Sequence, residues 1–185
     1  MYRIIPPFFT ALFSAFLFSC PQRTDPIDPG VLMATAQLQG WDLEIDGTIS
    51  FSEIIMHGTH IFGDIRGLEP NRIYAIHIHE GSSCEDSDAP GGHFDPARSG
   101  VHGHPGLSPA HRHAGDLPNI QAGSAGIAQV DYITNSIGLR ESPFSVIGKT
   151  IVLHADADDF TTQPYGGAGE RIACGVITAA NNPSN

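Results

Sequence analysis

Histidines are concentrated in one part of this 185-residue chain. Seven of the ten fall between residues 77 and 116, in the stretch HIHEGSSCEDSDAPGGHFDPARSGVHGHPGLSPAHRHAGD. Imidazole nitrogens are ligands that suit both zinc and copper, and carboxylates can complete such sites. The density of histidine in this stretch therefore indicates metal binding, and the question becomes which residues could share an ion.

His77 and His79 form the first candidate pair. Side chains of a strand alternate between its two faces, so both imidazoles share one face while Ile76 and Ile78 share the other. Two imidazoles on one rigid strand can converge on a common ion. A lone His-x-His pattern is weak evidence, because strand histidines also face solvent or form ordinary hydrogen bonds. The prediction therefore depends on the residues that follow.

Further candidate ligands lie downstream in short motifs: His93 in Gly-Gly-His-Phe-Asp-Pro, His102 in Val-His-Gly-His-Pro, and His113 with Asp116 in His-Ala-Gly-Asp-Leu-Pro. Three histidines and one carboxylate suit Zn²⁺ in a closed tetrahedral site. His154 stands at the end of another apolar segment, and together with His77 and His79 it makes an imidazole-rich set suited to copper. The other histidines are His57, His60, His104 and His111.

The segments that must position these ligands are short, alternate with a period of two, and are rich in Ile, Val, Thr and aromatic residues. They span residues 31–38, 47–54, 60–65, 72–79, 126–133 and 150–154. Frequent turn residues between such segments predict an all-β fold, an antiparallel sandwich or barrel. Two long connections, 80–125 and 155–170, interrupt the rhythm, and loops of that length in a compact domain are usually functional or disordered.

The N-terminal region has the features of an export signal. Residues 1–19 combine one charge, Arg3, with an apolar run too short to span a membrane, which predicts a signal peptide. The run ends in Leu-Phe-Ser-Cys, which resembles the lipobox of bacterial lipoproteins and makes Cys20 the predicted lipidation site. Residues 20–30 contain three prolines and read as a flexible tether. Residues 31–185 then form one domain.

Export affects how the cysteines and the charge are interpreted. An oxidising compartment permits disulfides, so if Cys20 carries lipid, Cys84 is left to pair with Cys174; two free thiols are the alternative. The formal net charge of −11 argues against nucleic acid or an anionic membrane surface as a partner. We therefore expect membrane contact only through Cys20.

The motifs together resemble the copper/zinc superoxide dismutases of the exported bacterial type, over nearly all of residues 31–178. His-Ile-His-Glu, Gly-Gly-His-Phe-Asp-Pro, His-Gly-His-Pro, His-Ala-Gly-Asp-Leu-Pro, Gly-Lys-Thr-Ile-Val-Leu-His-Ala-Asp-Ala-Asp-Asp and Gly-Glu-Arg-Ile-Ala-Cys-Gly-Val-Ile occur in the family's order. The resemblance implies a Greek-key barrel or sandwich of about eight strands with two long functional loops. It also implies disproportionation of superoxide to dioxygen and hydrogen peroxide, protecting the cell envelope.

The resemblance assigns roles to particular residues. Copper is expected on His77, His79, His93 and His154, and zinc on His93, His102, His113 and Asp116, with His93 bridging the two metals. Asp158 is expected to hydrogen-bond one ligand of each metal, Arg171 to guide the anion, and Cys84 to pair with Cys174. The family's spacing favours His102 over His104 and His113 over His111. The resemblance leaves open whether the protein is a monomer or a homodimer, because bacterial members of the family vary in their interfaces.

The metal-ligand motifs alone are compatible with two other kinds of protein. A metal store or delivery module on the same fold would keep the ligands but has no need of Arg171. A structural β-sandwich with incidental histidines would not match seven ligand positions. One departure from the family concerns electrostatics, because the segments 84–88 and 155–165 contain no Lys or Arg. We therefore predict weak steering of superoxide and a rate that falls little as salt rises.

Overall fold

The computed structural model describes residues 31–54 and 56–180. The predicted signal peptide at 1–19, the tether at 20–30 and the lipidation site Cys20 lie outside the described residues. Within the described part of the chain, no helix has the length and apolar character needed to cross a bilayer.

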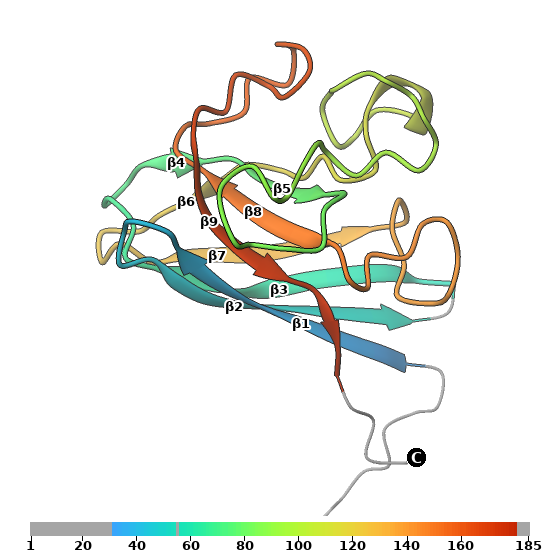
Figure 1. The fold of residues 1–185 in the computed structure, drawn as a ribbon, viewed down its shortest axis with the longest axis horizontal. Coiled ribbons are helices and arrows are strands. Elements are labelled where there is room, and N and C mark those ends of the chain that lie inside the picture. Colours follow the sequence, from blue (N-terminus) through green and yellow to red (C-terminus); the bar gives the residue numbers. More distant parts are fainter. Residues whose placement is uncertain (1–30, 55, 181–185) are drawn as a thin grey trace, which may run out of the picture.

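Strands account for nearly all the regular structure (Figure 1). They are β1 (Val31–Gly40), β2 (Asp46–Ile54), β3 (Gly58–Arg66), β4 (Ile73–Tyr74), β5 (Ile76–His79), β6 (Ile120–Gln121), β7 (Ala128–Thr134), β8 (Thr150–His154), β9 (Arg171–Val176) and β10 (Thr178–Ala179). A single turn of 3-10 helix, η1 (Pro109–His111), is the one helical element in the described residues. The predicted all-β fold is confirmed.

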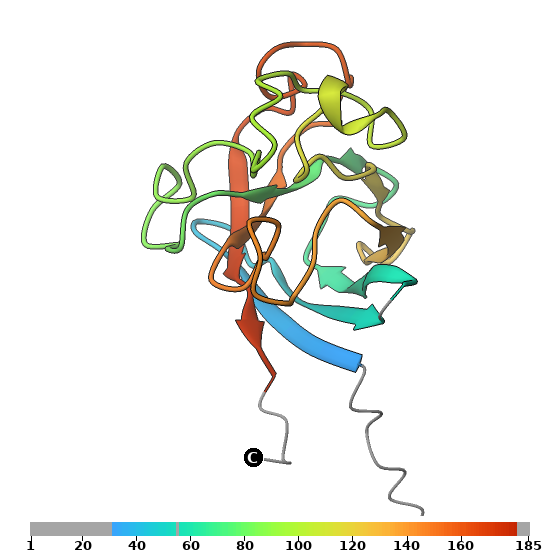
Figure 2. The same ribbon diagram turned by 90° about the vertical axis from the view of Figure 1, so that its right-hand side faces the viewer.

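Eight strands form one antiparallel sheet, with seven in the order β5-β8-β9-β1-β2-β3-β7 and β10 paired with β1. The contacts β3–β7, β5–β8 and β9–β1 join strands that are not consecutive in the sequence, as a Greek key requires. Between the two ends of this strand order, β4 pairs with β6, and the bridge Ala122–Ala128 links the end of β6 to β7. Because β4 runs on into β5, these pairings curl the sheet into a barrel, as Figure 2 shows.

The barrel core comes from the alternation that the sequence displays. Ala34, Ala36 and Leu38 of β1 are buried, while the residues between them are more exposed. Ile49 and Phe51 of β2 contribute to the same core in the same alternating way. One face of each strand thus fills the barrel and the other faces outward.

β5 and β8 depart from this alternation because every one of their residues is buried. Ile76 and Ile78 of β5 belong to the barrel core, so His77 and His79 project from the outer face of the barrel wall. That outer face must therefore be covered by other parts of the chain. The two long loops are the parts that cover it.

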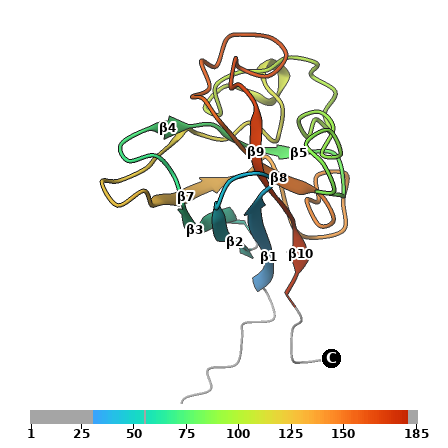
Figure 3. The same ribbon diagram turned by 60° about the vertical axis from the view of Figure 1, so that its left-hand side comes forward.

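The long loops lie on one side of the barrel and the two ends of the described chain lie on the opposite side (Figures 1 and 3). The first residue of β1, Val31, pairs with Ile54, whereas its last residues pair with Ala173 and Cys174 of β9, next to the end of the second loop. Both ends of the described chain, at the start of β1 and just after β10, thus lie away from the face that the loops cover.

Candidate metal centre

The first long loop is positioned by backbone hydrogen bonds to the edge of β5 that does not pair with β8. Ile78 donates its backbone N–H to Gly115 O at 3.0 Å, and its own carbonyl accepts from Phe94 N at 2.8 Å. These contacts extend the sheet with two short loop segments, and they bring His93 opposite His79 and Asp116 opposite His77. Residues distant in sequence therefore meet at the outer face of one strand.

Four imidazoles form the first cluster: His77, His79, His93 and His154, all buried, with candidate ligand atoms within 4.8 Å of one another. Hydrogen bonds fix the tautomers of two of them. His77 donates from Nε2 to Asp158 Oδ2 at 2.8 Å, and His79 donates from Nδ1 to Gly91 O at 3.0 Å. The other nitrogen of each ring therefore carries a free lone pair.

The free nitrogens of this cluster face one another. His79 Nε2 and His154 Nε2 are 3.3 Å apart, while His77 Nδ1 and His93 Nε2 are buried with no hydrogen-bond partner among the described residues. Buried polar atoms normally have partners, so converging unpaired nitrogens require a ligand. Imidazole nitrogens in this arrangement fit a copper ion, and the residues present are adequate to hold it.

The second cluster is His93, His102, His113 and Asp116, also buried with ligand atoms within 4.8 Å of one another. The Nδ1 atoms of the three histidines lie 2.8, 3.0 and 3.2 Å from a single oxygen, Asp116 Oδ1. Ligands about 2.0 Å from a tetrahedral ion lie about 3.3 Å from one another. Three nitrogens and one carboxylate oxygen at this spacing fit Zn²⁺.

Asp158 contacts both clusters. Its carboxylate accepts from His77 Nε2 at 2.8 Å through Oδ2 and contacts His102 Nε2 at 2.9 Å through Oδ1. Asp158 itself is almost fully buried. One carboxylate therefore orients a member of each histidine cluster, which is the role expected of Asp158.

Burial keeps the first cluster neutral in the metal-free protein. It lowers the pKa of His77 to about 4, that of His154 to about 4, and that of His79 well below the ordinary value. Burial likewise lowers the pKa of His93 to about 3. Metal ions bind only deprotonated imidazole, so these side chains are ready to bind at neutral pH.

His102 behaves differently because it lies between two carboxylates. Burial disfavours its charged form, yet hydrogen bonds to Asp116 and Asp158 outweigh burial and raise its pKa to about 9. For Asp116 and Asp158, burial also disfavours the charge, but hydrogen bonds from the histidines hold the pKa of each well below its usual range. A metal ion that binds His102 Nδ1 would therefore have to displace a proton.

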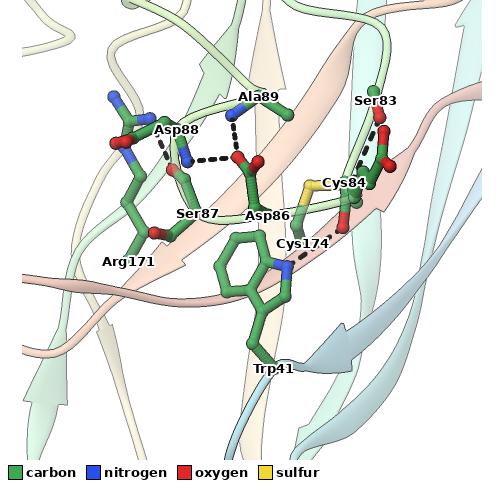
Figure 4. The surroundings of a disulfide bond; sticks show 10 residues. Trp41, Ser83, Cys84, Asp86, Ser87, Asp88, Ala89, Arg171 and Cys174 are labelled. Carbon is green, nitrogen blue, oxygen red and sulfur yellow. Dashed lines mark hydrogen bonds between the residues drawn. A yellow bond between two sulfur atoms is a disulfide. The ribbon is translucent and has the colours of Figure 1, made fainter.

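A disulfide joins Cys84 of the first loop to Cys174 of β9 (Figure 4). The loop beyond Cys84 is shaped by Asp86, whose Oδ1 accepts from the backbone N–H of Asp88 and Ala89. On its other side, Trp41 donates from Nε1 to Cys84 O at 3.0 Å. The segment 84–91 is thus fixed covalently and by hydrogen bonds.

Arg171 is held in place by hydrogen bonds to the backbone of this segment. It donates from Nη1 to Ser87 O at 2.7 Å and from Nη2 to Gly91 O at 2.5 Å. Gly91 O also accepts from His79, and Arg171 is the cross-strand partner of His154. The guanidinium is therefore held beside two members of the first cluster.

All the predicted ligands gather in these two clusters, and the competing histidines do not. His104 packs its ring against Phe160, and His111 contacts Ser108; both are exposed. His60 pairs with Asp131 on the outer surface of the barrel. The structure thus places His102 and His113 in the second cluster, and His104 and His111 outside it.

Two residues at the centre were not singled out by the sequence. Arg112, which is 6% exposed, donates to the carbonyls of Leu107 and His113. Tyr165 places its ring 5.1 Å from that of His93. Neither residue belongs to a chemical motif. Arg112 adjoins a ligand in the sequence, and that adjacency was the one signal available for it.

Comparison with known proteins agrees with this geometry. Residues 45–177 match the family model described as copper/zinc superoxide dismutase. The chain is 36% identical over 148 residues to the superoxide dismutase [Cu-Zn] of Deinococcus radiodurans, covering 75% of this chain and 80% of that protein. It is 37% identical over 151 residues to that of Caulobacter vibrioides, covering 78% and 84%.

An extracellular superoxide dismutase [Cu-Zn] of Brugia pahangi is 36% identical over 154 residues, covering 78% of this chain and 74% of that protein. Among solved structures, the clock protein EA4 matches with a TM-score of 0.72 and 34% identity, over 80% of this chain and 94% of that one. The chain belongs to the copper/zinc superoxide dismutase family. It is an oxidoreductase that acts on superoxide, and its metals are copper and zinc.

Proposed function

We propose that copper is held by His77, His79, His93 and His154, that zinc is held by His93, His102, His113 and Asp116, and that His93 bridges the two metals. The observation that carries this assignment is the position of His93, which belongs to both clusters. Its Nδ1 lies 2.8 Å from Asp116 Oδ1, and its Nε2 is buried and unpaired among the described residues on the side of the first cluster.

The bound copper supplies the one-electron oxidation and reduction of superoxide. The chain's own residues orient the site and handle protons. Asp158 fixes His77 and His102 through its two oxygens. His93 holds its Nδ1 toward Asp116, which leaves Nε2 as the atom that can take up a proton and return it to the reduced product.

Arg171 is proposed to bind the anion. A guanidinium has five N–H donors, and the two carbonyls that Arg171 contacts leave others free to receive an oxyanion. Its position beside His154 places that positive charge at the edge of the first cluster. A protein that only stored metal would gain nothing from this arrangement.

The test is the catalysed decay of superoxide by the protein loaded with copper and zinc, compared with His154→Ala. His60→Ala is the matched control, because His60 lies on the barrel surface and pairs with Asp131. We expect fast decay in the parent and in His60→Ala, and near-background decay in His154→Ala with loss of copper. Equal slow decay in all three proteins, despite bound metal, would instead indicate a metal-binding protein without turnover.

We propose further that the protein is exported to the periplasm or cell envelope, where it removes superoxide outside the cytoplasm, and that Cys20 carries the lipid that anchors it. The disulfide supports an oxidising compartment. Both ends of the described chain lie on the side of the barrel opposite the long loops, which supports a tether on that opposite side. An anchor attached there leaves the metal clusters uncovered.

Cell fractionation and labelling with a radioactive fatty acid test the localisation. In a bacterial host we expect the full-length protein in the envelope fraction and carrying label, and Cys20→Ser unlabelled. Unlabelled full-length protein free in the periplasm would keep the export proposal and remove the lipid anchor. Recovery from the cytoplasm with reduced cysteines would remove both.

A further inference from the structure

Two carboxamide side chains join the two long loops. Gln163 accepts from the backbone N–H of His102 through Oε1 at 2.8 Å and donates from Nε2 to His102 O at 2.8 Å. Asn119 makes the same pair of contacts with Asp158, accepting from its N–H at 2.8 Å and donating to its carbonyl at 2.9 Å. Each amide thus imitates the two-point pairing of a neighbouring strand.

The two clamps are reciprocal. Asn119 belongs to the first loop and holds a residue of the second, whereas Gln163 belongs to the second loop and holds a residue of the first. The residues that they hold contact each other, because His102 Nε2 lies 2.9 Å from Asp158 Oδ1. A single side-chain pair is therefore fixed through both of its backbones.

The tip of the second loop is closely fitted against this pair. At Gly166, a Cβ would lie 2.0 Å from Asp158 Oδ1 and 2.6 Å from His102 Nε2, and φ is +71°. Only glycine allows the loop to approach so closely in this conformation. Between Gln163 and Gly166, Tyr165 packs against His93. The segment 163–166 therefore contacts two of the three histidines of the zinc cluster.

We propose that Gln163 is a positioning residue for His102, setting the orientation of a zinc ligand from the second loop. This inference rests on the zinc assignment proposed above. The imidazole of His102 must direct Nδ1 to the ion and Nε2 to Asp158. Both directions depend on where the backbone of His102 lies. The two hydrogen bonds from Gln163 hold that backbone in place and so help to orient the ring. The clamp makes zinc binding depend on the position of the second loop.

The variant Gln163→Met tests this role, because methionine matches the length of glutamine and removes both hydrogen bonds without adding charge. Gln163 is exposed, so the substitution leaves the barrel core intact. Gln129→Met is the control, since it makes the same change at an exposed position of β7. Asn119→Leu removes the reciprocal clamp and is measured alongside.

Two readouts are taken on the full-length protein: the zinc dissociation constant by chelator competition, and the visible absorption of Co²⁺ in the zinc site. We expect the dissociation constant to rise about tenfold in Gln163→Met and in Asn119→Leu, because partners of metal ligands typically contribute 10–100-fold. The Co²⁺ absorption should weaken or shift as the tetrahedral geometry relaxes. Gln129→Met should match the parent in both.

The inference is overturned if Gln163→Met binds zinc within twofold of the parent and gives an unchanged Co²⁺ spectrum. A lower melting temperature with both readouts unchanged would also overturn it, since it would show a purely structural loop contact. If instead the parent itself binds no zinc, the zinc assignment fails and not the clamp alone; a parent that binds zinc but shows no dismutase activity when loaded would overturn the proposed function and leave the clamp standing.

Discussion

At the scale of single residues, Asp158 links the two clusters most directly. Its two oxygens contact His77 and His102, and each contact leaves the opposite ring nitrogen of the histidine free within its own cluster. A carboxylate can do this because both of its oxygens accept hydrogen bonds. An amide of the same shape has one acceptor and one donor, and it cannot serve both histidines.

The variant Asp158→Asn should therefore weaken both metal sites. We expect the affinity for copper and the affinity for zinc each to fall about 10–100-fold. In the metal-free variant the pKa of His102 should drop, because a hydrogen bond to Asp158 is one of the contacts that raise it. Chelator competition measures the first effect and an NMR titration of the imidazoles the second.

Asp64→Asn on β3 is the control for loss of charge alone. Retention of both metal affinities in Asp158→Asn would show that Asp116 and the backbone clamps are sufficient to orient the ligands.

At the scale of elements, the centre depends on how the first loop docks on the edge of β5. Gly115 lies at the closest point, where a Cβ would fall 2.2 Å from Ile78 O. The same glycine donates to Phe94 O and accepts from Ile78 N, so it connects the two loop segments through β5. His93 and Asp116 flank these contacts.

The variant Gly115→Ala should separate the loop from β5. We expect the metal-free protein to lose about 1–3 kcal/mol of unfolding free energy, as overpacked sites typically do, and zinc affinity to fall because Asp116 moves. Denaturant unfolding with a chelator present measures the stability. Gly148→Ala is a contrasting glycine variant, because a Cβ there meets nothing within 4 Å and any effect comes from its φ of +79° alone.

Much of this architecture could be predicted from residue patterns. Alternation identified most of the strands that supply the core, though not β9, and the shared face of His77 and His79 followed from it. The segment 72–79 was predicted as one strand, but it divides at Ala75 into β4 and β5 because its two halves pair with different partners. The two-residue strands β6 and β10 are too short for any period to be visible.

The loop clamps could not have been predicted in this way. Gln163 and Asn119 bind backbone atoms, which every residue has, so nothing in the sequence of their partners marks the contact. Their placement depends on the path of two loops whose ends are set by the barrel. Ligands are recognisable because metal chemistry restricts residue type, whereas backbone clamps carry no such restriction.

At the scale of the whole molecule, the buried histidines determine how stability depends on pH. In the metal-free protein the pKa of His77 and His154 is about 4 and that of His93 about 3, below the ordinary value of 6.5. As the pH falls below 6.5 the unfolded chain takes up protons that the folded chain excludes. Stability is therefore lost on acidification, by up to about 1.4 kcal/mol per pH unit for each histidine.

His102 acts in the opposite direction. Its raised pKa of about 9 means that its stabilising contribution is complete below pH 6.5 and is lost as the pH rises toward 9. We expect the unfolding free energy of the metal-free protein to be highest near pH 6.5 and to decline more steeply on the acid side. Denaturant titrations between pH 4 and 9 with chelator measure this. A flat profile from pH 4 to 6.5 would contradict it.

The charge distribution around Arg171 bears on how superoxide reaches the centre. The pocket in which Arg171 lies is lined by five carboxylates, Asp42, Glu85, Asp86, Asp88 and Glu170, and Arg171 is the one cation among its described lining residues. The whole chain is also acidic, with a formal net charge of −11. An approaching anion therefore meets a field that opposes its entry except very close to Arg171.

Salt screens this field, since the Debye length falls from about 30 Å at 0.01 M to about 10 Å at 0.1 M. We expect the second-order rate constant for superoxide, measured by pulse radiolysis, to stay level or rise between 0.01 M and 0.1 M salt. Glu170→Lys should raise the rate at low salt and make it fall as salt increases, whereas Asp64→Lys should change it less, because β3 is separated from β9 by β1 and β2. A steep fall with salt in the parent would mean that Arg171 dominates the local field despite the surrounding carboxylates, and that steering is strong.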